Sequence, residues 1–220
     1  MVPGETRDEG GQLQRQEILE GAAAPIEFHS GSRQSVATVV REFLFSGIHH
    51  IFIGPDHILF VVGLLLLGDS VGQLLKIITA FTVAHSITLG LATFRVLSPP
   101  ASIIEPAIAA SIVVVGVHAF LGKRGRDPRM IFAFAFGLIH GFGFANVLQE
   151  MVLPQAALGW SLFAFNAGVE IGQACIIALV APLLALVQRR SEVVAARVVE
   201  TGALAVTVAG AFWFFQRIMS

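Results

Sequence analysis

Histidine and acidic side chains inside long apolar stretches are the feature of this chain that could do chemistry. Six of the seven histidines lie in such stretches, and one short segment combines His50, Asp56 and His57 in a His-x5-Asp-His arrangement. An ionisable group is costly in hydrocarbon, so its presence there marks a functional site. Imidazole suits nickel, cobalt, zinc and copper, and carboxylate completes the charge balance. The pattern therefore predicts a site for a divalent transition metal.

Further candidate ligands follow along the chain. The expected metal ligands are His50, Asp56, His57, His85, His140 and Glu170, with Glu105 and Asn166 as weaker candidates. A helix rises about 1.5 Å per residue, which places most of these groups in the outer-to-middle part of a bilayer and His118 nearer the other side. Glycines predict close approach of the helices that carry His85, His140 and Glu170. These glycines are Gly137, Gly141, Gly143, Gly168 and Gly172.

Most of the candidates also have a purely structural explanation, and for His57 it is a place beside Asp56 at a capped helix start. Asp56 stands near a helix start, where the helix dipole favours an acid. Glu105 precedes Pro106 and could cap a helix. His85, His140 and Asn166 could each form a hydrogen bond between helices. Glu170 could be a neutral, hydrogen-bonded carboxyl.

The composition is that of an integral membrane protein. Of the 220 residues, 55% are hydrophobic and 13% are charged, whereas about a quarter of a soluble domain is charged. The formal net charge of −1 argues against nucleic-acid binding. Cys175 is the sole cysteine, which excludes an intrachain disulfide and a zinc site built from thiols.

Apolar runs of about 20 residues predict membrane-spanning helices. Six are expected, at about 48–69, 74–95, 102–121, 130–150, 158–187 and 197–217. Gly54-Pro55 interrupts the first, so either a kinked helix runs through His50 or Pro55 begins a new helix. Residues 35–48 predict a helix at the membrane interface. The expected fold is an all-α, polytopic membrane helix bundle over 35–220, with about six transmembrane helices and an N-terminal interfacial helix.

The polar ends and loops predict the orientation. Residues 1–34 are polar and Gly-rich and are expected to be flexible. Three loops that share one side carry most of the basic residues: Lys76; Lys123, Arg124, Arg126 and Arg129; and Arg189, Arg190 and Arg197. The positive-inside rule places them in the cytoplasm and both termini outside. An outside N-terminus without an apolar signal sequence suggests a fragment or a processed form.

Five stretches together resemble the HupE/UreJ family of small bacterial membrane proteins, over most of 47–173. They are GIHHIFIGPDHILFVVGLLLL, KIITAFTVAHSITLGLA, IIEPAIAASIVVVGV, FGLIHGFGFANVLQEMVLP and FNAGVEIGQ. The resemblance implies a six- to seven-helix protein of the bacterial inner membrane, associated with nickel or cobalt uptake. Its first motif matches His50, Asp56 and His57, and its His-Gly motif matches His140. Phe144 stands where hydrogenase-linked members have a second histidine.

The leading functional hypothesis is a transporter for a divalent transition metal, nickel or cobalt. The residues of the first motif would capture the ion from outside, and His85, His140 and Glu170 would pass it inward. The expected partners are the metal ion and the lipid bilayer, with no nucleic acid, and a homo-oligomer is an open option. Because histidine and carboxylate ligands must be deprotonated, occupancy should fall in acid.

A membrane-embedded, zinc-dependent hydrolase is the alternative. Three of the histidines would hold zinc and leave one position open for water. Asp56 or Glu170 would act as the general base, with Ser86 assisting. A metal-sensing or accessory subunit without turnover is a third option.

Overall fold

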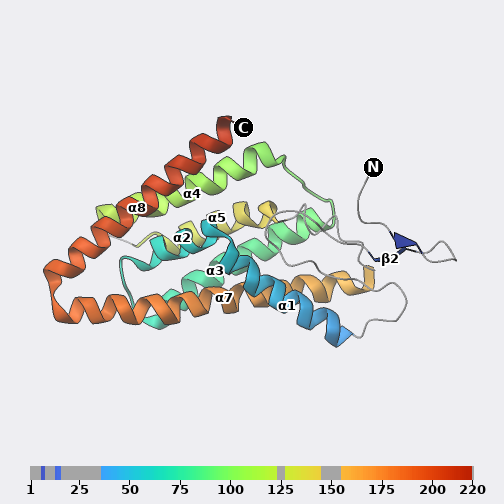
Figure 1. The fold of residues 1–220 in the computed structure, drawn as a ribbon, viewed down its shortest axis with the longest axis horizontal. Helices are drawn as coiled ribbons and strands as arrows, with labels where there is room; N and C mark the ends of the chain where they lie inside the picture. The colour runs from blue at the N-terminus through green and yellow to red at the C-terminus, as the bar shows by residue number, and fades with distance from the viewer. Residues whose placement is uncertain (1–5, 8–12, 16–35, 123–126, 145–154, 220) are drawn as a thin grey trace.

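The structure, a computed structural model, describes residues 6–7, 13–15, 36–122, 127–144 and 155–219. Within these residues it has seven helices, which form one bundle (Figure 1). They are α1 (Val36–Ile53), α2 (Pro55–Leu65), α3 (Val71–Thr93), α4 (Ala101–Leu121), α5 (Arg129–Gly143), α7 (Gln155–Arg190) and α8 (Glu192–Met219). Two short antiparallel strands, β1 (Thr6–Arg7) and β2 (Leu13–Arg15), precede them. The all-α prediction is confirmed, and the rest of the segment 1–34 predicted to be flexible lies outside the described residues.

Four of the described helices are each long and apolar enough to cross a membrane. They are α3, α4, α7 over Leu158–Arg190, and α8. The pair α1 and α2 meets the same criterion only as one broken span, and α5 has 15 residues. The polytopic bundle is therefore confirmed, with four such spans among the described residues, or five with the broken pair, where six were predicted. The predicted end of the fourth span, at 145–150, lies outside the described residues.

The helix break at Gly54 decides how the first part of the chain is arranged. Gly54 is extended (φ −83°, ψ 97°), Pro55 begins α2, and the two helices meet at a bend of 72°. Proline lacks the N–H that would continue α1 but suits the first position of a new helix. Of the two predicted alternatives, the new helix is therefore correct. The predicted boundary at residue 48, between the interfacial helix and the first span, is wrong, because α1 runs without interruption from Val36 to Ile53.

Glycines let three pairs of helices pack closely, namely α1 with α7, α3 with α5, and α4 with α8. A Cβ at Gly141 would collide with the Thr88 hydroxyl and the His85 carbonyl, so α5 approaches α3 only because the side chain is absent. The predicted close approach of these two helices is confirmed. Gly168 of α7, however, packs against the backbone of α1 at Leu44, so this glycine serves a different pair from the predicted one.

One end of the bundle is tied together by Arg129. The α2–α3, α4–α5 and α7–α8 connections share this end (left in Figure 1). The described basic residues assigned to loops at this end lie in the adjoining helices: Lys76 in α3, Arg189 and Arg190 in α7, and Arg197 in α8. Arg129 was counted among the loop charges, but it begins α5 and its side chain is fully buried. Its guanidinium donates to Asp127 (2.6 Å), Asp69 (2.7 Å) and the Leu64 carbonyl (2.9 Å). Lys123, Arg124 and Arg126 lie outside the described residues.

Candidate metal site

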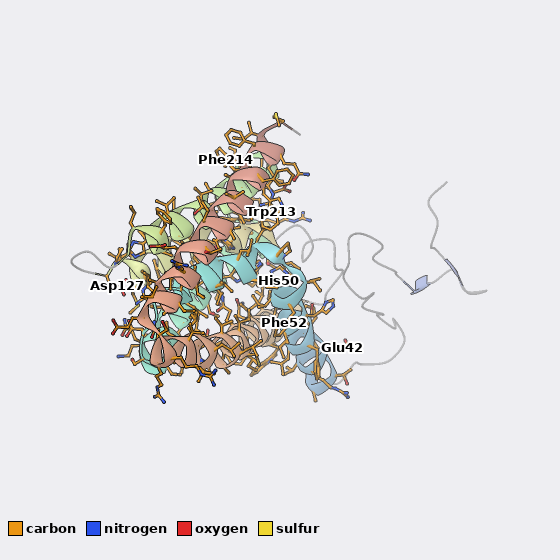
Figure 2. All side chains as sticks on the ribbon, turned by 60° about the vertical axis from the view of Figure 1, so that its left-hand side comes forward. Glu42, His50, Phe52, Asp127, Trp213 and Phe214 are labelled. Carbon is orange, nitrogen blue, oxygen red and sulfur yellow. The ribbon has the colours of Figure 1, made fainter. Side chains whose placement is uncertain are left out.

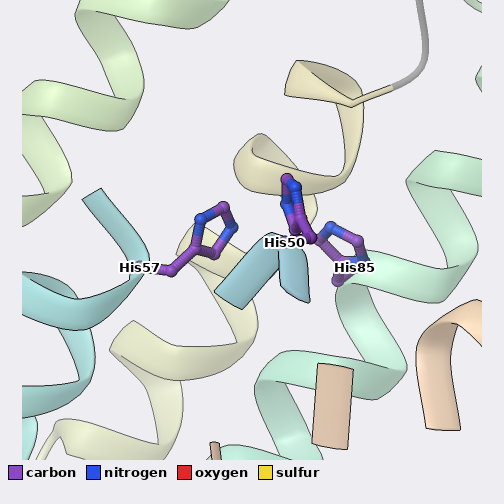
Figure 3. Close-up of side chains that lie close together, drawn as sticks. All are labelled: His50, His57 and His85. Atoms are coloured by element: carbon purple, nitrogen blue, oxygen red, sulfur yellow. The ribbon is translucent and has the colours of Figure 1, made fainter. Parts of the chain in front are cut away.

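Three imidazoles meet at the break between α1 and α2. His50 of α1, His57 of α2 and His85 of α3 each offer one ring nitrogen, and these nitrogens all lie within 4.8 Å of one another (Figure 3). In the described part of the chain, no other three His, Cys, Asp or Glu side chains have this geometry. Two nitrogens that share one ion at metal–nitrogen distances of about 2.0–2.1 Å lie at most roughly 4.2 Å apart. Small side-chain rotations would therefore bring the three rings onto one ion.

The break at Gly54 makes this convergence possible. The His50 and His57 ring centroids are 4.6 Å apart. A Cβ on Gly54 would lie 2.9 Å from both the His50 carbonyl oxygen and the His57 Nδ1 atom, which is closer than real Cβ contacts. Glycine at this position thus allows the ring of His57 to fold back over the end of α1.

Four ring nitrogens in this cluster lack hydrogen-bond partners among the described residues. The atoms concerned are His50 Nε2, His57 Nδ1 and Nε2, and His85 Nε2, and all are buried. Leaving a buried polar group unsatisfied costs about 1–3 kcal/mol, and native proteins contain few such groups. Four of them on three adjacent side chains indicate a place built to receive a ligand. Imidazole lone pairs suit a transition-metal cation.

A fourth imidazole, that of His140 on α5, borders the cluster. Its ring centroid lies 5.1 Å from that of His57, and the residue is almost fully buried. Its Nε2 atom is 2.9 Å from the hydroxyl of Ser111 on α4. Its Nδ1 atom is buried without a partner in the described residues. The aromatic rings of Phe60 and Phe81 lie 5.2 and 5.3 Å from the His140 ring, so this side of the cluster is apolar.

Asn166 of α7 contacts the cluster through His85. Its Oδ1 atom lies 3.1 Å from His85 Nδ1, and its Nδ2 atom donates to the Leu162 carbonyl (2.8 Å). The side chain therefore holds the ring of His85. The interhelical hydrogen bond, one of its two predicted roles, is therefore present, and its role toward a metal stays a prediction.

Asp56 is not part of the imidazole cluster, although it adjoins His57. Its Oδ2 atom forms an ion pair with Arg217 of α8 at 2.7 Å, and both side chains are partly exposed. Consecutive side chains on a helix diverge by about 100°, since a turn takes 3.6 residues, so Asp56 and His57 point to different neighbours. Arg217 also donates to the backbone carbonyl of Glu105, whose side chain is exposed.

The other candidates lie apart from the cluster. Glu170 accepts a hydrogen bond from Thr79 of α3 at 2.5 Å, in an exposed contact. The Ser86 hydroxyl donates to the Thr82 carbonyl of its own helix. The ring of His118 packs on Phe132. The structure thus brings His50, His57, His85 and His140 together but leaves Asp56, Glu105, Glu170 and Ser86 in other contacts.

Two residues of the site escaped the sequence analysis. Ser111 is a hydroxyl in the apolar run of α4, and a polar side chain in such a run could have marked it as a candidate. Arg217 lies near the C-terminus, and nothing in the local sequence connects it with Asp56, which is 161 residues away.

The fold and the buried imidazoles define a multi-pass helical membrane protein with a candidate metal site. The family described as HupE / UreJ protein matches residues 28–217, so the chain belongs to this family. The resemblance stated from the motifs is therefore confirmed. Neither a curated protein nor a solved structure matches the chain.

Proposed function

We propose that this protein carries a divalent transition-metal ion, nickel or cobalt, across the membrane, and that His50, His57, His85 and His140 bind it. The observation that carries the proposal is the convergence of four imidazoles from four helices inside an apolar bundle. Their buried nitrogens have no partners in the described part of the chain. Family membership supports the same class of cargo.

The ligand chemistry fits an ion that must enter and leave. Imidazoles are neutral donors that bind nickel and cobalt well, yet they leave the double positive charge of the ion uncompensated. A charge in low-dielectric surroundings is destabilised unless an opposite charge is close. Asp56, the nearest acid in sequence, is already paired with Arg217. A site of this kind supports binding without permanent capture.

The hydrolase alternative receives less support from the geometry. A zinc hydrolase needs a general base beside the metal-bound water. The two predicted bases contact other groups: Asp56 pairs with Arg217 through Oδ2, and Glu170 accepts from Thr79. Ser86, predicted to assist, donates to the Thr82 carbonyl. None of these contacts places a carboxylate among the imidazoles. Transport is therefore the function that we propose.

Uptake of radioactive nickel or cobalt tests the proposal, in cells without their own uptake system. His50→Ala and His85→Ala should each abolish uptake that the wild-type protein confers. His49→Ala is the matched control, because His49 is the exposed neighbour of His50 and should leave uptake intact. Unchanged uptake in both cluster variants, at equal amounts in the membrane, would refute the proposal. Zinc that survives purification and does not exchange would favour the hydrolase instead.

A further inference from the structure

We infer that Ser111 and Asn166 are positioning residues that fix which nitrogen of His140 and of His85 carries the proton, so that each ring turns a lone pair toward the metal site. The inference rests on the proposed metal-binding function. It assigns a role to a serine on α4 that was not among the candidate site residues of the sequence. It also gives His140, whose ring borders the three-histidine group, Nδ1 as the atom that would reach the ion after a shift of the ring toward His57.

The hydrogen bonds of Ser111 determine the form of His140. The Ser111 hydroxyl is fully buried and has one proton, which it donates to the Ile108 carbonyl at 2.6 Å. With that proton committed, the oxygen can only accept from His140 Nε2, 2.9 Å away. The neutral ring of His140 therefore carries its proton on Nε2. Its lone pair is on Nδ1, the buried atom with no partner among the described residues.

The hydrogen bonds of Asn166 determine the form of His85 by the same reasoning. The amide nitrogen of Asn166 donates to the Leu162 carbonyl at 2.8 Å, which fixes the amide so that Oδ1 faces His85. An amide oxygen only accepts, so His85 Nδ1 must carry the proton. The lone pair of His85 is then on Nε2, which is likewise buried and unpartnered in the described residues.

These two contacts place the proton on different nitrogens in the two rings, and in both cases they leave a lone pair free for a metal ion. His140 is protonated on Nε2 and His85 on Nδ1, and in each ring the nitrogen left without a proton is the one left without a partner. Both of these nitrogens are buried, one in the three-histidine group and the other in the ring that borders it. Partners behind a ligating histidine commonly fix its tautomer and orientation in this way, and their loss typically weakens metal binding by about 10- to 100-fold.

Magnetic resonance on the full chain in lipid nanodiscs, with isotope-labelled histidine, reads the protonated nitrogen of each ring directly. The expected result is a proton on Nε2 of His140 and on Nδ1 of His85. Ser111→Ala should remove the preference in His140 and weaken binding of Ni²⁺ alone by about 10- to 100-fold. Ser111→Thr keeps a hydroxyl and should restore both properties.

Matched variants separate positioning from packing. Thr93→Ala removes another hydroxyl that donates to its own helix, at the Leu89 carbonyl, and should change neither property. Asn166→Leu should act on His85 as Ser111→Ala acts on His140. Gln173→Leu removes a neighbouring α3–α7 hydrogen bond, to Thr82, and serves as its control.

The possible outcomes separate this inference from the proposed function. A proton on Nδ1 of His140 in the wild type, or wild-type Ni²⁺ affinity in both Ser111→Ala and Asn166→Leu, would overturn the inference even if the cells take up nickel. Expected tautomers in a wild-type protein that confers no uptake would overturn the transport proposal instead. Should Ser111→Ala fail to fold, Asn166→Leu with its control decides the question.

Discussion

Two of the places where the bundle buries polar side chains treat them in opposite ways. At one end, Arg129 is fully buried and each of its three side-chain nitrogens donates a hydrogen bond, to Asp127, to Asp69 and to backbone carbonyls. At the break between α1 and α2, the histidine rings leave buried nitrogens without partners in the described residues. Figure 2 shows His50 and Asp127 well apart in the bundle. Buried polar atoms that all have hydrogen-bond partners indicate a structural role, whereas several buried polar atoms without partners in one place indicate a binding site.

Replacing His57 should have the largest effect on binding and little effect on stability. In His57→Leu, Ni²⁺ affinity should fall by more than about 100-fold, the upper end for loss of a mere supporting partner. Stability should stay level or rise, because leucine removes two unpartnered buried nitrogens. Metal titration and thermal unfolding of the same purified protein measure both. A large loss of stability with retained affinity would reverse the contrast between the two regions.

Replacing Arg129 should show the opposite pattern. Arg129→Leu removes the guanidinium that donates to Asp127, Asp69 and the Leu64 carbonyl, and we expect the free energy of unfolding to fall by about 3 kcal/mol. This is the low end for a broken buried pair, because both carboxylates remain partly exposed. Arg129→Lys should recover only part, since an ammonium lacks the planar fork. Denaturant unfolding in detergent measures the change, and Ni²⁺ affinity should stay near that of the wild type.

A glycine pair sharpens the comparison on the binding side. In Gly141→Ala, the new methyl group meets the Thr88 hydroxyl and the His85 carbonyl, which should destabilise the protein by about 1–3 kcal/mol and weaken metal binding. Gly90→Ala in α3 is the control, because nothing lies within 4 Å of its Cβ. Helix propensity should make that change neutral or stabilising by up to about 1 kcal/mol. Equal effects of the two substitutions would show that α5 need not approach α3 closely.

The smallest effect is expected at Arg217. Its ion pair with Asp56 is partly exposed, so Arg217→Gln should change stability by about 1 kcal/mol or less. Ni²⁺ affinity should rise modestly, because the substitution removes a positive charge next to Asp56, close to the bound cation. Arg190→Gln, at the far end of α7, makes the same change in net charge and should leave the affinity unaltered. Weaker binding in Arg217→Gln would show that this ion pair supports the site.

Much of the fold follows from the sequence, because long apolar runs leave a helix few alternatives in a membrane. The predicted spans 74–95 and 102–121 agree with α3 and α4 within a few residues. The break at Gly54 was offered as one of two alternatives, since Pro55 permits both a kink and a new helix. Only packing of α2 against its neighbours could decide between them.

The site was harder to predict than the helices. His50, His57, His85 and His140 were named as candidates from their residue type and depth, and the structure places them near one another. Asp56 and Glu170 satisfied the same criteria but are paired with Arg217 and Thr79. Partners so distant in the chain depend on how whole helices pack. Arg129 stands at the first position of a helix, where the helix dipole disfavours a positive charge. That unfavourable position could have indicated that the side chain has acidic partners.

The bend of 72° at Gly54 has a mechanical consequence for any ion held by His50 and His57. Seven residues along one straight helix would separate the two rings by about 10 Å along the axis, whereas across the elbow their centroids are 4.6 Å apart. An ion bound by both rings would therefore hold α1 and α2 at this angle. The two helices could not become collinear without releasing the ion, so the bend angle at Gly54 and the occupancy of the site would change together.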